Sequence, residues 1–130
     1  MLPKGLELRI EKNVLYWENL TGFITEKEAI NVSKEIKHIL EERPIRALIV
    51  DNRKLTGVWT PEVDQVWIEL MSELPHKVNR TATLCQNVIN KLQLNYLSKQ
   101  AGTTENVKAF IEEEKSEIME YLGLPELHLK

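Results

Sequence analysis

The stretch Arg46–Trp67 constrains the fold more than any other part of the chain. It begins with a short apolar run, Ala47–Val50, whose branched residues are typical of a strand covered on both faces. The polar residues Asp51–Lys54 end that run. Thr60–Glu62 then has the composition of a helix start, because Thr accepts a bond from a free amide, Pro has no N–H to leave unpaired, and Glu complements the helix dipole. A strand, a turn and a capped helix in this order form half of a parallel crossover unit.

A hairpin and a helix are predicted ahead of this unit. Apolar and charged residues alternate from Leu6 to Glu11, and a second apolar run covers Val14–Trp17. Asn13, between them, suits the left-handed position of a tight turn. Thr25 and Glu28 form a capping box at the start of a helix. That helix is predicted to bury one stripe: Ala29, Val32, Ile36, Ile39 and Leu40.

Helix and strand patterns alternate after the central strand. The helix that begins at Thr60 has the most regular apolar stripe: Val63, Val66, Trp67, Leu70, Met71 and Leu74. A further strand is predicted at Thr81–Cys85, and Asn87 is expected to cap a third helix. The stripe assigned to that helix is Val88, Leu92, Tyr96 and Leu97. Val107–Phe110 is a candidate last strand, and a closing helix is assigned the stripe Ile111, Ile118, Met119 and Leu122.

This order, ββαβαβα(β)α, predicts an α/β fold with a mixed sheet of four to five strands and helices packed on it, in a single domain over residues 1–130. The 17 Lys and Arg against 20 Asp and Glu give a net charge of −3, which does not indicate nucleic-acid binding. No apolar stretch approaches the ~20 residues of a transmembrane segment, and no signal-peptide core is present. With one Cys and therefore no internal disulfide, we expect a cytoplasmic protein.

No motif of the sequence is typical of an enzyme or a metal site. His38, His76 and His128 lie in separate segments without metal-ligand spacing, and the five Gly residues are isolated, so no phosphate loop is formed. Cys85, at the end of a strand, is expected to be a small buried apolar group. We therefore expect no catalytic residue, no metal and no cofactor.

One rim of the predicted sheet is the candidate site, because ligands of open α/β sheets bind beyond the carboxyl ends of the strands. The residues placed there or beside it are Asp51, Asn52, Arg53, Thr56, Gly57, Trp59, Thr60 and Asn87. Helix N-termini at Thr60 and Asn87 can attract an anion, and Trp59 can form an apolar wall. The alternative is that Asp51 and Asn52 only turn the chain, and that an exposed Trp17 or Trp59 marks a partner surface.

Three segments resemble one known family. Leu48–Asp51, followed by Leu55–Gly57 and by Trp59 and Trp67, resembles the strand-Asp, Gly-Trp and helix-Trp pattern of the SpoIIAA-like branch of STAS domains, which is sometimes grouped with the lipid-carrier SEC14 fold. Thr81–Cys85 is similar to that branch's next strand, and Val107–Leu122 to its closing strand and helix. A Gly-x-Trp sequence replaces the family's Gly-Trp, and the last helix lacks a Trp.

The resemblance implies a non-catalytic regulatory or interaction module, of bacterial origin, that binds a protein partner or forms a homodimer. It predicts a flat, partly apolar surface around Trp59 and the helix Thr60–Glu73. The alternative is a carrier of a small anionic or lipid-like ligand at the carboxyl ends of the strands, which predicts a closed pocket of several hundred Å³.

A control by phosphorylation is also implied. STAS-type anti-sigma-factor antagonists are phosphorylated on a Ser at the start of the helix after the central strand, where a phosphate suits the helix N-terminus. Thr56 and Thr60 are the only hydroxyls in that segment, so they are the candidate phosphorylation sites by analogy. The simpler interpretation is a turn residue at Thr56 and a helix cap at Thr60.

Overall fold

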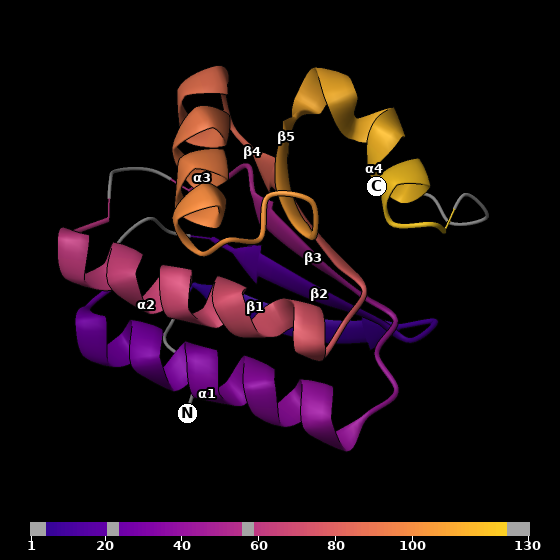
Figure 1. The fold of residues 1–130 in the computed structure, drawn as a ribbon, viewed down its shortest axis with the longest axis horizontal. Helices are drawn as coiled ribbons and strands as arrows, with labels where there is room; N and C mark the ends of the chain where they lie inside the picture. Colours follow the sequence, from indigo (N-terminus) through magenta and orange to yellow (C-terminus); the bar gives the residue numbers. More distant parts are fainter. Residues whose placement is uncertain (1–4, 21–23, 56–58, 125–130) are drawn as a thin grey trace.

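The described part of the chain is a mixed five-stranded sheet with helices on both faces (Figure 1). The computed structural model describes residues 5–20, 24–55 and 59–124. The strands lie in the order of the sequence: β1 (Leu6–Glu11), β2 (Val14–Asn19), β3 (Ala47–Asn52), β4 (Arg80–Cys85) and β5 (Val107–Ile111). β1 and β2 are antiparallel, and all later neighbours are parallel. The helices are α1 (Glu26–Glu42), α2 (Pro61–Glu73), α3 (Val88–Gln100) and α4 (Lys115–Tyr121), with 3-10 turns at Leu74–His76 and Glu112–Glu114.

This arrangement confirms the predicted α/β class, and the candidate last strand is present as β5. Local signals determine where the elements begin. Lys12 and Asn13 have φ values of 52° and 65°, as a tight turn between β1 and β2 requires. Thr25 accepts a hydrogen bond from the amide of Glu28, whose side chain in turn accepts from the amide of Thr25, so the predicted capping box starts α1.

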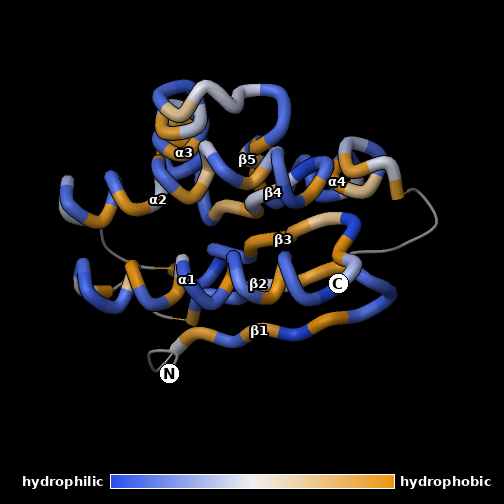
Figure 2. The backbone as a smooth tube through the Cα atoms, turned by 60° about the horizontal axis from the view of Figure 1, so that its bottom comes forward, coloured by the Kyte–Doolittle hydropathy of each residue, from blue (hydrophilic) through white to orange (hydrophobic). Residues whose placement is uncertain are grey.

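The sheet separates two apolar cores, because successive side chains of a strand point to opposite faces. Leu48 and Val50 of β3 face α1, α2 and α3, whereas Ala47 and Ile49 face α4. All four are at most 7% exposed, which confirms that β3 is covered on both faces. In Figure 2, hydrophobic residues dominate this strand and alternate with hydrophilic ones along α1 and α2.

The stripe predicted for α3 is wrong in three of its four residues. Val88, Leu92 and Tyr96 are 52%, 62% and 59% exposed, and only Leu97 of that stripe is buried. The buried side of α3 consists of Leu94, Leu97 and Ser98 instead. α3 has apolar residues on two sides, so its apolar periodicity alone does not identify the side that faces the core.

Two smaller expectations also change. Ile111 ends β5 rather than beginning the last helix, and α4 is a short helix that starts at Lys115. Trp17 is 5% exposed, so it belongs to the core and not to a partner surface. Within the described part of the chain, none of the helices has the length and hydropathy of a membrane span.

Candidate functional site

The structure divides the predicted rim between the two faces of the sheet. Asp51 and Asn52 are consecutive residues at the end of β3, so their side chains point in opposite directions. Asp51 is half-buried on the face of α4, whereas Asn52 is 3% exposed and lies on the face of α1–α3. The rim is therefore two separate environments, one charged and one largely apolar.

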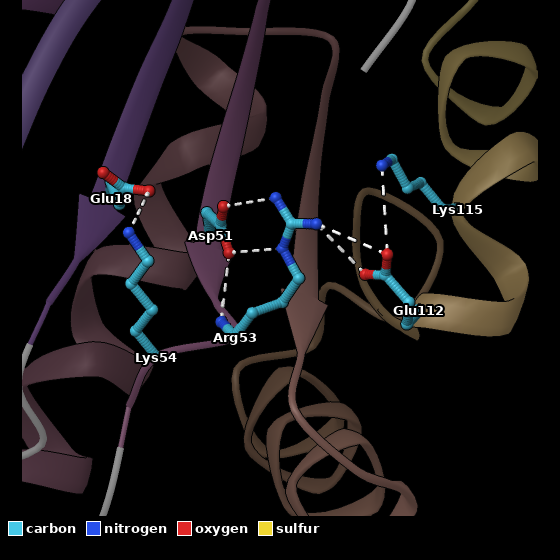
Figure 3. A network of polar contacts seen from close by, with 6 residues as sticks. All are labelled: Glu18, Asp51, Arg53, Lys54, Glu112 and Lys115. Carbon is cyan, nitrogen blue, oxygen red and sulfur yellow. Dashed lines mark hydrogen bonds and ion pairs between the residues drawn. The ribbon is translucent and has the colours of Figure 1, made fainter. Parts of the chain in front are cut away.

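Arg53 organises the charged environment (Figure 3). Its guanidinium forms two hydrogen bonds to the Asp51 carboxylate, at 2.8 Å and 3.1 Å, and its backbone amide donates a third, at 3.0 Å. The same guanidinium reaches Glu112, just after β5, at 3.1 Å. Lys54 lies 3.8 Å from Glu18 beside this group. Carboxylates from two separated segments thus meet one arginine, which is a bidentate arrangement that lysine cannot reproduce.

This ion-pair network changes the acidity of Asp51. Partial burial by itself raises the pKa of its carboxyl, but the hydrogen bonds and the positive charge of Arg53 outweigh burial and lower the pKa overall. The pKa of Arg53 is raised by the same pair, mainly through its hydrogen bonds to Asp51. The charges at this end of β3 therefore compensate one another.

A pH dependence of stability follows from the lowered pKa. Because the folded protein binds the proton of Asp51 less readily than the unfolded chain does, Asp51 stabilises the fold above the unfolded pKa of about 4, and this stabilisation is lost as the pH falls through the folded pKa. We expect the free energy of unfolding of Asp51→Asn to fall less steeply below about pH 4 than that of the unchanged protein. Urea titrations between pH 2 and pH 7 measure this, and equal slopes for the two proteins would contradict it.

The apolar environment contains a row of buried side chains from three elements. The indole N–H of Trp17 donates to the Asn19 side-chain oxygen at 2.9 Å, and the Asn19 amide donates to the Asn52 side-chain oxygen at 2.6 Å. The ring of Trp67 from α2 meets the rings of Trp17 and Trp59 edge-on, with centroids 5.4 Å and 5.7 Å apart. A hollow of about 40 Å³, lined by all three tryptophans and both asparagines, lies between this cluster and the sheet.

Thr60 and Asn87 are both helix caps. The Thr60 hydroxyl accepts from the amide of Val63 at 3.3 Å, and the Asn87 side chain accepts from the amide of Asn90 at 2.9 Å. Both residues are exposed. Thr56 and Gly57 lie outside the described residues. The structure thus gives Thr60 the capping role that its sequence predicts, and its phosphorylation stays a hypothesis.

The capping role of Thr60 predicts how substitutions at this position change the stability of the protein. Thr60→Ala removes the acceptor of the Val63 amide and is expected to lower the free energy of unfolding by about 1 kcal/mol. Thr60→Ser is the matched control, since it keeps the hydroxyl and should change stability by a few tenths of a kcal/mol. Chemical denaturation followed by circular dichroism measures both variants. Equal losses for Ala and Ser would show that the hydroxyl is not what stabilises the helix start.

An exposed apolar surface on α3 is the feature that the sequence interpretation missed. We call it the α3 stripe, and it consists of four side chains with exposed fractions of 52%, 75%, 62% and 59%: Val88, Ile89, Leu92 and Tyr96. Among the other described residues, the sole large apolar side chain in the same exposure class is Ile30, at 38%. Spacings of three, four and seven residues place Ile89, Leu92 and Tyr96 on one side of the helix, so the signal was present in the sequence but was assigned to the core.

The lone cysteine and the possible metal ligands are the remaining candidates. Cys85 is fully buried, as predicted, and burial raises the pKa of its thiol to about 12, so the reactive thiolate is not formed near neutral pH. No group of three metal-ligating side chains occurs among the described residues.

Comparison with known proteins yields neither a matching family model nor a similar curated protein. The five-stranded mixed sheet, in the element order ββαβαβαβα, is consistent with a STAS-like topology.

Proposed function

We propose that the protein is a non-catalytic interaction module that binds a protein partner through the α3 stripe. The observation that carries the proposal is the exposure of four large apolar side chains, at 52–75%, on a single two-turn surface. Large apolar side chains grouped in this way on a folded domain are typical of an interaction surface. Tyr96 adds a hydroxyl to an apolar ring, a combination that is enriched at protein interfaces.

The charges around the stripe also suit a protein interface. α3 contains no Asp or Glu, although the chain has 20 of them. Its Lys91 is bound to Glu114, with both carboxylate oxygens at 2.8 Å, and so points its charge toward the region after β5. The central part of a protein interface is depleted of charged residues in the same way.

The other side of α3 holds the stripe in place. Leu94 and Leu97 are 7% and 4% exposed, and they join the core beneath the helix. The Asn95 side chain accepts a hydrogen bond from the backbone amide of Ala109 at 2.8 Å, which fixes the helix to β5. The α3 stripe is therefore presented by a rigid element, which lowers the entropy lost on binding.

The proposal moves the expected partner surface from α2 to α3. The apolar stripe of α2 is buried, and Trp59 is half-buried against Trp67. Arg53 at the rim already binds Asp51 and Glu112. This arrangement does not favour the alternative function, in which the rim carries a small anion. The STAS-like topology supports an interaction role, and membership of the SpoIIAA-like branch is part of the proposal.

Site-specific photo-crosslinking tests the interaction. A benzophenone amino acid at Leu92 is expected to give one discrete covalent adduct with a protein in cells of the source organism, whereas the same amino acid at the exposed Lys34 of α1 gives none. An adduct of twice the protein's mass identifies the partner as a second copy. Equal adduct patterns from both positions, or no adduct from Leu92, would contradict the proposal.

A charge placed in the stripe is expected to abolish this adduct. Ile89→Lys should lower the affinity for the partner more than tenfold, because a lysine at the centre of an apolar interface must lose its hydration. The free energy of unfolding should change by less than about 0.5 kcal/mol, because Ile89 is 75% exposed. Leu92 crosslinking in the Ile89→Lys background measures the first effect and urea denaturation the second. An undiminished adduct would show that the stripe does not bind the partner.

A further inference from the structure

The first strand, β1, lies at one edge of the sheet and has an open side. It pairs with β2, and no other strand of the described chain pairs with its outer side (Figure 2). Its pairing with β2 is one to one from Leu6 to Glu11, so it contains no bulge, and this strand has neither Pro nor Lys. Proline, lysine and bulges are common features that prevent a sheet edge from pairing with another chain. β1 is therefore able to add a partner strand.

The tight turn determines which backbone groups of β1 point outward. In a two-residue turn of this kind the flanking residues, Glu11 and Val14, form a hydrogen-bonded pair, and such pairs alternate along the two strands. The hydrogen bond from the Leu20 amide to the Gly5 carbonyl oxygen, at the other end of the two strands, fits this alternation. The N–H and C=O groups that point away from the sheet therefore belong to three residues: Leu6, Leu8 and Ile10.

The two faces of β1 differ in the same alternation. Leu8 and Ile10 pack on the core beneath α1–α3 but stay partly exposed at the edge. The other face carries exposed charges of alternating sign: Glu7, Arg9 and Glu11. Charges that protect an edge by repulsion would have one sign, whereas alternating signs can match those of a second strand with the same sequence.

Glu7 has no partner of opposite charge among the described residues. It lies directly opposite Glu18 of β2, a like charge that is 3.8 Å from Lys54. In the part of the chain that the structure describes, Glu7 forms no ion pair of its own. Like charges directly opposite each other destabilise a pair of strands. A positive charge at the outer side of β1 would offset this cost.

We propose that a second copy of this chain supplies that charge, by antiparallel pairing of the two β1 strands about a two-fold axis. With Leu8 opposite Leu8 of the second copy, Leu6 meets Ile10, so the outward backbone groups of all three residues are paired. On the exposed face, Glu7 then lies opposite Arg9 of the second copy, and the two-fold axis repeats this contact. The two five-stranded sheets become one continuous sheet.

Arg9 is accessible to this contact. Its guanidinium pairs with Glu11 of the same strand and lies 4.0 Å from the centre of the Tyr16 ring. The side chains of Arg9 and Glu11 are nevertheless 55% and 61% exposed. An ion pair so exposed to solvent contributes little energy, so it does not prevent a further contact of Arg9 with Glu7 of the second copy.

Charge selects the register of the two strands. Since outward groups must meet outward groups, the register can change only in steps of two residues. One step places Glu7 opposite Glu7 of the second copy, and one step in the other direction places Arg9 opposite Arg9. Larger shifts shorten the overlap, because β1 has only six residues. The proposed register alone combines a long overlap with opposite charges.

Charge reversal tests the pairing. Sedimentation equilibrium of the full chain over a range of concentrations is expected to show a monomer–dimer equilibrium. Glu7→Arg places like charges opposite each other twice in the dimer and should raise the dissociation constant more than about tenfold, as should Arg9→Glu. Glu120→Arg is the matched control, because it makes the same change of charge at an exposed position of α4, which packs on β4 and β5. It should change the constant less than about threefold.

The double variant Glu7→Arg/Arg9→Glu exchanges the two charges and restores both contacts in the proposed register. Its dissociation constant should return to within about threefold of that of the unchanged protein. A mixture of the two single variants should also form mixed dimers, although each variant alone stays largely monomeric. Circular dichroism spectra of all variants verify that the fold is kept.

Three outcomes would overturn the proposal. The first is a protein that stays monomeric at all concentrations, and the second is a dimer that Glu7→Arg does not weaken. The third is a double variant that stays as monomeric as the single variants, since the charges then act in another way than by facing each other. This inference does not rest on the α3 stripe: Ile89→Lys should dimerise normally, and a dimer lost in that variant would instead be one that forms through the stripe.

Discussion

Trp67→Ala is expected to lower the free energy of unfolding by about 3–5 kcal/mol, which is the range for removing a large buried aromatic side chain. Trp67 is 5% exposed and stands at the centre of the tryptophan cluster, in edge contact with Trp17 of β2 and with Trp59 before α2. Its removal takes away a large buried apolar surface and both ring contacts, each of which adds about 0.5–1.5 kcal/mol beyond area alone. The existing hollow would also become larger, and a larger cavity increases the loss.

Urea denaturation followed by far-ultraviolet circular dichroism measures this effect without relying on tryptophan emission. Tyr96→Ala is the matched control, because it removes an aromatic ring that is 59% exposed and should cost less than about 0.5 kcal/mol. The comparison separates the buried aromatic cluster of α2 from the exposed stripe of α3. A loss of similar size in both variants would mean that the α3 stripe is part of the core rather than a free surface.

Most of the fold could be predicted from local signals, because those signals are physically strong and act over few residues. The run Ala47–Val50 has to be covered on both faces, and the capping residues Thr25, Thr60 and Asn87 place three helix starts. The stripe of α2 was also predictable, since its apolar residues lie on one side alone. Each of these sequence patterns is compatible with only one local structure.

The side of α3 that faces the core could not be decided in the same way. Its apolar residues form two rows on different sides of the helix, and periodicity cannot tell which row meets the sheet. The outcome depends on tertiary partners: Asn95 binds Ala109, and the Ser98 hydroxyl donates to the backbone oxygen of Val107 at 2.7 Å. Two apolar rows on one helix are a notable sequence pattern, because a surface helix needs only one apolar row to pack on its own domain.

The division of the rim was predictable in principle. Asp51 and Asn52 are adjacent residues of one strand, so strict alternation already places them on opposite faces. What the sequence does not contain is the identity of their partners, because Asn19 and Glu112 come from segments far from β3 in the chain. Long-range polar contacts of this kind have no local periodicity.

The buried asparagine pair is expected to have the second-largest effect on stability. Asn52→Ala leaves the Asn19 amide, 2.6 Å away in the folded protein, without its acceptor, and should cost about 1–3 kcal/mol. Asn19→Ala should cost more, about 3 kcal/mol, because Asn19 joins two groups: it accepts from the Trp17 indole and donates to Asn52. Both residues are at most 8% exposed, so water cannot easily replace the lost partners.

The double variant determines whether the two asparagines act as a pair. Once Asn19 is absent, Asn52 has lost the donor that it binds, so Asn52→Ala should then cost little, and the two single effects should exceed the double effect by about 0.5–3 kcal/mol. Urea denaturation of the four proteins closes this cycle. Additive losses would show that the asparagines stabilise β2 and β3 independently. The order of the single losses is the sharper criterion, because a smaller loss for Asn19→Ala than for Asn52→Ala would mean that the Trp17 indole finds another acceptor once Asn19 is absent.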